Sequence, residues 1–422
     1  MVIVNTTLPQ LRDDIRISPF PDGPRAARGE YLVEAGTTFY VVNAAMHRVL
    51  AALEHRPATL ADLVARCNAD GGQPLTEEQL RGVVWGQFPA TLFADSAPAA
   101  RRSPLLVRKT LLRESVVVRV SRSLTWMFTP AAATVVLAFF AASLLLSFSS
   151  PSATATPVAG GELVLIVALV LASMLVHELG HASACARFGC PPGEIGAGIY
   201  LVFPVMYTDV TRAWRLPPRS RAVVDLGGLY FQSLVVSVSA VYAWQTGSAS
   251  ARWFVWLSML SMAHMLNPMY KMDGYWLLTD LSGLTNLHDR TYTAIRGGLA
   301  RLLGRAPRST AAEAGVQRGI LAAYCTLFTL YFILVGRALV TAGGAAVRAY
   351  PALATEFSSA VSSAGGHDAS TPLLALGKFL SGTFWILIIL IALFFLARRV
   401  YLLLVPAAPA RPALLAPPSP EA

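Results

Sequence analysis

The sequence contains few charged residues and few lysines. Charged residues account for 14% of its 422 residues and hydrophobic residues for 55%, whereas soluble domains contain about 25% charged residues. This shortage excludes an ordinary soluble protein as a description of the whole chain and favours a membrane protein. Only three of the 34 basic residues are lysines, and alanine is abundant. This bias is typical of a high-GC bacterial genome.

Cysteine is also scarce, and its spacing excludes two kinds of site. The four cysteines form no CxxC pair, so neither a redox motif nor a thiolate zinc site is supported. Cys185 and Cys190 follow the polar motif described below. Free cysteines in membrane helices usually serve as small packing residues, and we expect this role for both. The N-terminus lacks a basic stretch followed by an apolar one, so we expect no signal peptide.

Six apolar runs are each longer than the roughly 18 residues that mark a spanning helix. They cover residues 125–148, 162–186, 222–244, 253–278, 320–340 and 373–397. Arginines gather in three of the intervening or terminal segments, namely 187–221, 279–319 and 398–422. The other loops, 150–161, 245–252 and 341–372, contain only two basic residues, Arg252 and Arg348. The positive-inside rule then predicts a multi-pass protein of the bacterial inner membrane with both termini in the cytoplasm.

The formal net charge of +10 raises the question of nucleic-acid binding. Residues 96–122 contain seven basic residues and a single acid, Glu114, directly before the first apolar run. A basic segment on the cytoplasmic side of a span is what the positive-inside rule predicts. We therefore expect the lipid bilayer, and no nucleic acid, as a partner.

The first 95 residues differ from the rest because they contain no long apolar run. Short β-like stretches at 31–33 and 38–42 alternate with segments of helical periodicity, which cover 41–53, 59–70 and 75–88. Thr59 and Thr76 are candidate N-caps of the second and third of these helices. The pattern predicts a small α+β domain of the winged-helix type.

The second apolar run contains the sequence His177-Glu178-Leu179-Gly180-His181. On a helix, residues i and i+4 share a face, so both imidazoles can reach one metal ion. Glu178 lies at the neighbouring edge, where it can accept a proton from a water held at the metal. Ordinary polar packing is the alternative, but ionisable residues inside a span cost roughly 2.5–3.5 kcal/mol each. Three such residues within five positions need a compensating partner, and a metal ion is the natural one.

The fourth apolar run offers a third ligand in the segment from Asn267 to Gly274. Asp273 is a carboxylate in an apolar stretch, and the parallel course of the second and fourth runs gives it a depth similar to that of His181. Pro268 and Gly274 would loosen the helix, as is tolerated where the backbone lines a cavity. The alternatives for Asp273 are a salt bridge with Lys271 or a helix end at the membrane interface. His264 lies roughly 13 Å before Asp273 along a helix, so we expect it to pack in the core or to support a metal ligand from behind, and not to bind the metal itself.

HELGH in one span and NPxxxxDG in a later one resemble the site-2 protease family of intramembrane zinc metalloproteases. The resemblance implies that His177, His181 and Asp273 bind zinc, that Glu178 is the catalytic base, and that Asn267 steadies the substrate or the oxyanion. Residues 196–214 resemble the membrane-associated segment that guides substrate in this family. The third run lacks the family's GPxxN pattern, and Gln232 stands where the asparagine would be.

The N-terminal domain resembles PqqD-like winged-helix domains that hold the leader peptides of ribosomally made natural products. With the zinc motif, this arrangement is similar to the peptide zinc metalloprotease branch. A leader peptide on this domain is therefore an expected partner, with a regulatory or dimerisation domain as the equal alternative. The expected substrate is a peptide or a membrane protein.

Together these features predict an all-α membrane protein with about six transmembrane helices and a small N-terminal α+β domain. The expected domains are 1–95 (winged-helix-like), 96–123 (basic linker), 124–285 (catalytic transmembrane core), 286–403 (accessory transmembrane helices) and 404–422 (disordered tail). The predicted activity is zinc-dependent peptide-bond hydrolysis. The alternatives are a non-catalytic membrane protein that binds, exports or confers immunity to a peptide, and a metal or haem transporter whose histidines line the pathway.

Overall fold

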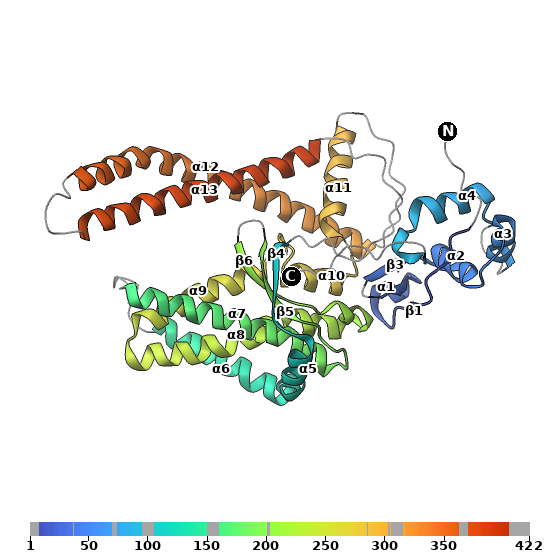
Figure 1. Ribbon diagram of the computed structural model, residues 1–422, viewed down its shortest axis with the longest axis horizontal. Coiled ribbons are helices and arrows are strands. Elements are labelled where there is room, and N and C mark those ends of the chain that lie inside the picture. Colours follow the sequence, from blue (N-terminus) through green and yellow to red (C-terminus); the bar gives the residue numbers. More distant parts are fainter. Residues whose placement is uncertain are drawn as a thin grey trace. The chain divides into compact units, whose positions relative to one another are not determined.

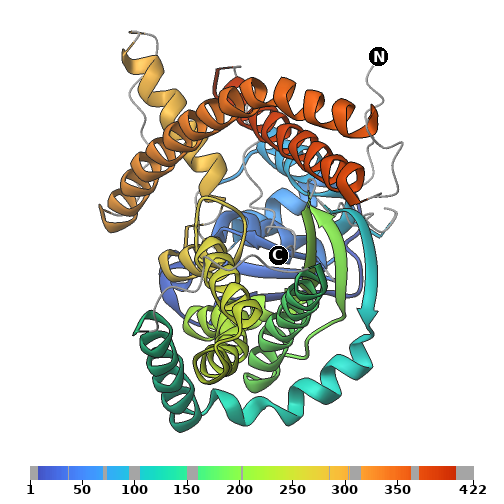
Figure 2. The same cartoon turned by 90° about the vertical axis from the view of Figure 1, so that its left-hand side faces the viewer.

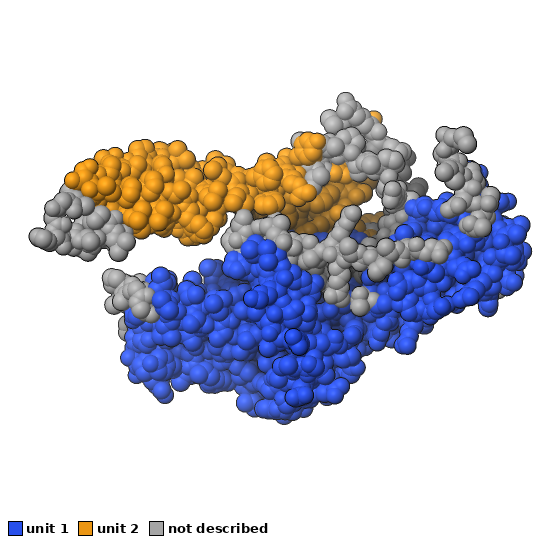
Figure 3. Space-filling view, in the orientation of Figure 1, with its two compact units in different colours: residues 1–286, 411–422 blue, residues 287–410 orange. Residues whose placement is uncertain are grey.

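The computed structural model describes most of the chain as two compact units. The described residues are 8–36, 38–69, 74–94, 105–149, 160–200, 203–284, 286–302, 304, 315–362 and 370–404. The first unit ends at Asn286, and the second begins at Leu287 (Figure 3). The tail that we expected to be disordered lies outside the described residues.

The N-terminal domain is built on a three-stranded antiparallel sheet. Its strands are β1 (Ile15–Pro19), β2 (Tyr31–Ala35) and β3 (Thr38–Val42), in the order β1-β2-β3. Gly36 has a φ of +62° in the turn between β2 and β3, a conformation that glycine adopts without steric cost. A short helix, α1 (Gly23–Ala27), connects β1 to β2. The sequence pattern predicted β2 and β3 but missed β1.

Three further helices cover one face of this sheet. They are α2 (Ala44–Glu54), α3 (Leu60–Ala69) and α4 (Glu77–Arg81), and a π-helical turn (η1, Gly82–Gln87) follows α4. The side chain of Thr59 accepts a hydrogen bond from the Asp62 amide at the start of α3, and Thr76 forms a capping box with Gln79 at the start of α4. Both predicted caps are therefore present. Leu50 and Leu63 are fully buried in the core between these helices and the sheet.

The centre of the first unit is a bundle of long apolar helices. These are α6 (Pro130–Ser149), α7 (Gly160–Arg187), α8 (Pro218–Thr246) and α9 (Ala249–Met265), which lie side by side (Figures 1 and 2). Helices α7 and α8 are in direct backbone contact at two glycines, because a Cβ at Gly180 would overlap the carbonyl oxygen of Gly227. Such close backbone contact through small residues is typical of helix packing in membranes.

The fourth apolar run is not one helix, which corrects the prediction for residues 253–278. Helix α9 ends at Met265, and α10 (Asp273–Ser282) begins after a loop. Pro268 lies in that loop, where its ring and missing N–H prevent a continuous helix. Five helices among the described residues are long and apolar enough to cross a membrane: Pro130–Ser147, Glu162–Arg187, Pro218–Thr246, Gly315–Ser362 and Ala375–Tyr401. The orientation of the termini stays a prediction.

A second antiparallel sheet lies against α7. We predicted an all-α membrane part, and this sheet corrects that prediction. Its strands are β4 (Leu105–Leu112), β5 (Ile195–Tyr200) and β6 (Phe203–Thr208), in the order β4-β5-β6 (Figure 2). The segment expected to be a basic linker supplies β4 and then helix α5 (Glu114–Ser123), which packs on α7. Two short 3-10 helices, η3 (Thr125–Phe128) and η4 (Thr211–Arg215), precede α6 and α8 respectively.

The described residues of the second unit form three helices. They are α11 (Leu287–Leu302), α12 (Gly315–Ser362) and α13 (Ser370–Leu404). Helix α12 contains the fifth apolar run and continues through residues that we predicted to be a loop, 341–362. This stretch is rich in alanine, the best helix former, and one interior proline, Pro351, does not end the helix. Phe357 and Phe379 stack between α12 and α13 with ring centroids 5.2 Å apart.

Candidate metal centre

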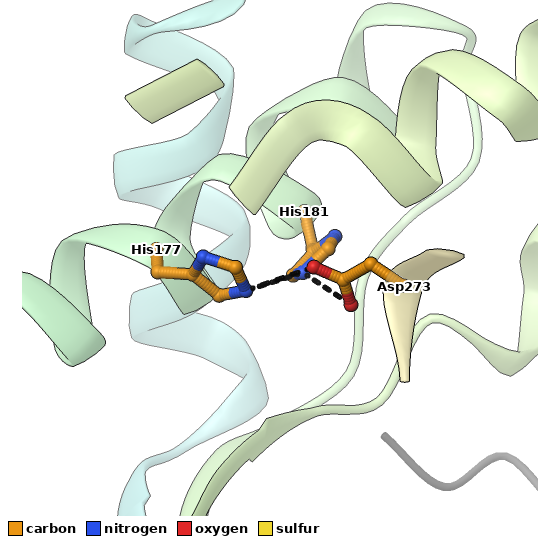
Figure 4. A group of neighbouring side chains, drawn as sticks. All are labelled: His177, His181 and Asp273. Carbon is orange, nitrogen blue, oxygen red and sulfur yellow. Dashed lines mark hydrogen bonds and ion pairs between the residues drawn. The ribbon is translucent and has the colours of Figure 1, made fainter. Parts of the chain in front are cut away.

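The histidines of the HExxH motif are four residues apart, just over one turn of α7, so both lie on one face of the helix. The Nε2 atoms of His177 and His181 lie 3.1 Å apart, and both side chains are buried. Figure 4 shows the two rings directed toward a common point, which Asp273 also faces. The local helical geometry that the motif predicted therefore exists in the structure.

Asp273 reaches the histidines from the first residue of α10. Its Oδ2 lies 3.2 Å from Nε2 of His177, and its Oδ1 lies 3.6 Å from Nε2 of His181. The break between α9 and α10 makes this approach possible, because the chain folds back tightly on itself there. A Cβ at Gly274 would overlap the backbone of Leu266, so glycine is required for the fold-back.

Hydrogen bonds on the far side of each imidazole fix its orientation. Nδ1 of His181 lies 2.7 Å from the carbonyl oxygen of Val224, and Nδ1 of His177 lies 3.2 Å from Oε1 of Gln232. Both partners belong to α8 and are assigned here as acceptors, so each Nδ1 carries the proton and each Nε2 keeps a free lone pair. Metal-binding histidines almost always have such an outer partner.

Gly228 leaves the space in which the two imidazoles meet. A Cβ at this position of α8 would overlap Nε2 of His177 and would approach Nε2 of His181 nearly as closely. The residue lies between Val224 and Gln232 on the same face of α8. This face of α8 therefore provides the two acceptors and the gap between them.

Glu178 lies beside this group and is held by the second sheet. The Oγ1 hydroxyl of Thr208, the last residue of β6, donates a hydrogen bond to Oε2 of Glu178 over 2.7 Å. Both residues are buried, Glu178 with 5% and Thr208 with 6% of its surface exposed. A carboxylate that is buried and oriented in this way can take up a proton at its second oxygen.

The donor set fits a tetrahedral zinc ion. With zinc–ligand bonds of about 2.0–2.1 Å, two ligand atoms of a tetrahedron lie about 3.3 Å apart. The two Nε2 atoms lie 3.1 Å apart, and the Asp273 carboxylate comes within 3.2 Å of one through Oδ2 and within 3.6 Å of the other through Oδ1. All three separations are close to that edge length, although the two carboxylate distances belong to different oxygens. Oδ2 of Asp273 is buried without a hydrogen-bond donor, and the facing Nε2 atoms carry lone pairs. Three electron-rich groups that converge in a buried site need a cation among them.

Four other residues singled out in the sequence lie outside this group. Asn267 is in the loop between α9 and α10, and its Oδ1 accepts a hydrogen bond from the Met269 amide. Its predicted catalytic role stays a prediction. His264 packs against the ring of Tyr270, as expected of a packing residue. Cys185 and Cys190 are free and buried in one apolar cluster, which confirms their predicted packing role.

Sequence patterns did not identify Thr208, Val224 or Gly228 as part of the centre. Thr208 falls in the segment 196–214, which the family resemblance marked, but nothing distinguished it from its neighbours. Val224 contributes only a backbone carbonyl, which is invisible in a sequence. Gly228 follows Gly227, and a pair of small residues in an apolar run is the only available signal.

Comparisons with known proteins give limited similarity. No family model matches the chain, and no solved structure matches it. A curated protein of Bacillus subtilis (strain 168), named "Putative peptide zinc metalloprotease protein YydH", is 26% identical to it over 117 residues. The match covers 27% of this chain and 46% of the relative, so the chain spans about half the length of the curated relative that it matches.

Proposed function

We propose that this chain is a zinc-dependent intramembrane metalloprotease that hydrolyses a peptide bond in a precursor peptide or a membrane-tethered regulator. The observation that carries the proposal is the buried convergence of His177, His181 and Asp273 beside Glu178. Helix α7, which bears the motif, is apolar and long enough to cross a membrane. Two histidines and a glutamate in HExxH spacing are the arrangement that metalloproteases use for hydrolysis.

Each side chain of the centre has a separate task in this mechanism. His177, His181 and Asp273 would hold the zinc ion, which when bound supplies the Lewis acidity that activates water and polarises a carbonyl group. Glu178 accepts the proton of the attacking water and then delivers it to the nitrogen of the departing peptide. Thr208 occupies Oε2 of Glu178 with its hydroxyl, so the proton is carried on Oε1.

For Asn267 we propose contact with the substrate or with the developing oxyanion. Its Oδ1 is engaged by the Met269 amide, so the side-chain NH₂ group is the end that can donate a hydrogen bond. The loop that contains Asn267 leads directly into Asp273, which places the amide on the same segment as a metal ligand. Donors aimed at a developing negative charge are a common source of rate enhancement.

The proposed setting is the bacterial inner membrane, with both termini in the cytoplasm. The five apolar helices and the distribution of arginines support this setting. The printed name of the similar Bacillus protein refers to a peptide zinc metalloprotease, which supports a peptide substrate. We further propose that the N-terminal domain binds the leader part of that peptide.

A non-catalytic membrane protein that binds, exports or confers immunity to a peptide is the second candidate. It would use the same three metal ligands. The hydrogen bond from Thr208 to Glu178 favours the enzyme, because a protein that only binds a peptide does not need a buried, oriented carboxylate beside the metal ligands.

Replacement of Glu178 by glutamine separates these two candidates. The Glu178→Gln variant should keep the zinc content of the unaltered protein, measured by mass spectrometry of purified protein in detergent. Cleavage of a precursor peptide encoded by a neighbouring gene and expressed in the same cells should fall about 100- to 10,000-fold, the usual contribution of a general base.

Glu162→Gln is the matched control, since Glu162 lies on the same helix, in its first turn. That variant should cleave at the rate of the unaltered protein. Normal cleavage by Glu178→Gln would refute the mechanism. If the unaltered protein binds zinc but cleaves no neighbouring precursor peptide or membrane-tethered regulator, the binding protein becomes the better interpretation.

A further inference from the structure

The sheet of the N-terminal domain is covered on both faces. One face packs on the domain's own helices. The other face carries a separate apolar cluster, and Trp214 from η4 packs against it. The members of this cluster are Phe20, Leu32, Phe39 and Val41. A tryptophan of the helical core therefore closes the sheet, and the domain is docked on that core.

Arg25 of α1 lies deep in this contact. Only 1% of its surface is exposed, and its guanidinium carbon lies 4.7 Å from the ring centre of Trp214 and 5.2 Å from that of Phe20. None of its three guanidinium nitrogens has a hydrogen-bond partner. Burial, together with the nearby cation of Arg221, lowers the pKa of Arg25 to about 10. Cation–π contacts therefore hold this buried charge.

The same indole contacts a second arginine, which belongs to α8. The guanidinium carbon of Arg221 lies 5.3 Å from the ring centre of Trp214. Its Nε lies 2.9 Å from Oδ2 of Asp280 on α10, and the two side chains are 4% and 9% exposed. Arg221 Nη1 also donates to the carbonyl oxygen of Leu216. The pair Arg221–Asp280 is thus a buried ion pair that ties α8 to α10.

Helix α1 touches the end of each of these two helices. A Cβ at Gly23 would lie 2.6 Å from Cγ of Pro218, the first residue of α8. A Cβ at Gly283, directly after α10, would lie 2.7 Å from Cβ of Pro24. Arg28 donates from Nη2 to the carbonyl oxygen of Gly283 over 2.9 Å. The N-terminal domain therefore fixes the start of α8 and the end of α10 together.

These two helices also carry parts of the metal centre. Helix α8 supplies Val224 and Gln232, the acceptors that orient the imidazoles, and Val224 lies one turn after Arg221. Helix α10 begins with Asp273 and reaches Asp280 about two turns later. Since helices move as rigid elements, a shift of the ion pair displaces the carboxylate of Asp273 relative to the histidines.

We propose that Arg25, Arg221 and Asp280 are positioning residues of the metal centre. The docked N-terminal domain clamps the Arg221–Asp280 pair through Arg25 and Trp214, and the pair sets the distance between Asp273 and the two imidazoles. The metal affinity of the core then depends on a residue of another domain. This role rests on the proposed metal site and not on proteolysis.

Cobalt titration of the full chain in detergent tests this role, because tetrahedral Co²⁺ absorbs visible light and reports its ligand geometry. Arg25→Met and Asp280→Asn should each weaken Co²⁺ binding about tenfold, the lower end of effects seen for outer partners of metal ligands. Both should also shift the visible absorption band. Arg25→Lys keeps a cation over the indole and should restore binding to within about threefold.

Arg215→Met is the matched control at the same junction. Arg215 pairs with Glu34 and lies over the ring of Phe39 at the edge of this contact, where it lines a cavity of about 460 Å³. It has no described contact with Arg221 or Asp280, so its loss should leave Co²⁺ binding and the spectrum unchanged. Circular dichroism checks the fold of each variant. If Asp280→Asn does not fold, the test rests on Arg25→Met alone.

Two results would overturn the positioning role while leaving the metal centre intact. Folded Arg25→Met could bind Co²⁺ with native affinity and spectrum, or Arg215→Met could lose as much affinity as Arg25→Met. If the unaltered protein binds neither Co²⁺ nor Zn²⁺, the metal centre itself is refuted, and the positioning role with it.

Discussion

Two pairs of long apolar helices, α7–α8 and α12–α13, differ in how much of their surface is buried and in the residues at which they meet. Of the most apolar stretches of α7 and α8, 28% and 56% is buried, against 11% and 0% for α12 and α13. The first pair meets backbone to backbone at Gly180 and Gly227. In the second pair, glycines face large side chains, such as Gly336 against Leu396.

The difference follows from what each pair must enclose. Helices α7 and α8 bury imidazoles whose polar atoms need partners within reach, and only close backbone contact brings a carbonyl such as that of Val224 to the ring of His181. Among the described residues, α12 and α13 bury no imidazole between them. The guanidinium of Arg399 lies instead over the rings of Phe328 and Phe332, and larger side chains fill their contact. Small residues next to polar residues in an apolar helix therefore indicate close backbone contact around a buried polar group.

Replacement of Gly228 by alanine should have the largest effect on metal binding. The added methyl group would occupy the position where the Nε2 atoms of His177 and His181 meet, so zinc affinity should fall more than about 100-fold, beyond the usual loss from outer partners. Gly382→Ala on α13 is the matched control, since its Cβ would meet only Cδ1 of Leu353, the far end of a flexible side chain. Zinc analysis after dialysis against a chelator measures the zinc retained by each variant. Equal retention by the two variants would contradict the special role of the close contact between α7 and α8.

Gln232→Leu should have the next largest effect. It removes the acceptor that holds Nδ1 of His177 and leaves that N–H buried without a partner. Loss of such an outer partner typically lowers metal affinity about 10- to 100-fold. Gln245→Leu provides the control, because Gln245 lies on the same helix but is exposed. A competition titration with a zinc chelator compares the two, and native affinity in Gln232→Leu would show that the imidazole needs no acceptor there.

Thr208→Val should reduce catalysis while leaving metal binding intact. The hydroxyl contacts Glu178 and no metal ligand in the described contacts, so zinc content should not change. A hydrogen bond to a charged group contributes about 1.5–3 kcal/mol, and the lower end of this range corresponds to the cleavage rate about tenfold lower that we expect. Thr329→Val on α12 removes a hydroxyl that bonds only its own helix, at the Cys325 carbonyl, and should cleave normally. Loss of zinc from Thr208→Val would place the threonine in metal binding instead.

Local patterns in the sequence predicted the most, and long-range pairing the least. His177, Glu178 and His181 stand out because a helix brings i and i+4 together without help from any other segment. The sheet β4–β5–β6 was missed because β4 and β5 are separated in the sequence by the whole of α6 and α7. The role of Thr208 was missed for the same reason, because Thr208 reaches Glu178 as part of that sheet.

Hydropathy also misplaced helix ends, because it measures composition and not backbone geometry. It read residues 253–278 as one span, although Pro268 and the fold-back at Gly274 divide them into α9 and α10. That break is what brings Asp273 to the histidines. Conversely, the fall in hydropathy after residue 340 predicts a loop, while the alanine-rich stretch continues α12 to Ser362.

The smallest effect, and the one of opposite sign, is expected for glycines that have space around them. At Gly344 of α12 the nearest atoms to an added Cβ are guanidinium nitrogens of Arg348, 3.7 and 3.9 Å away. Gly344→Ala should therefore stabilise the helix by up to about 1 kcal/mol, the difference in helix propensity between the two residues.

At Gly180 the same substitution should destabilise the protein by about 1–3 kcal/mol or more, because the added methyl group would overlap the backbone of α8. Thermal unfolding of both variants in detergent measures the sign of each change. Equal destabilisation by the two substitutions would mean that both helix pairs depend on close backbone contact. The close contact of α7 and α8 would then have no special connection with the polar groups buried between them.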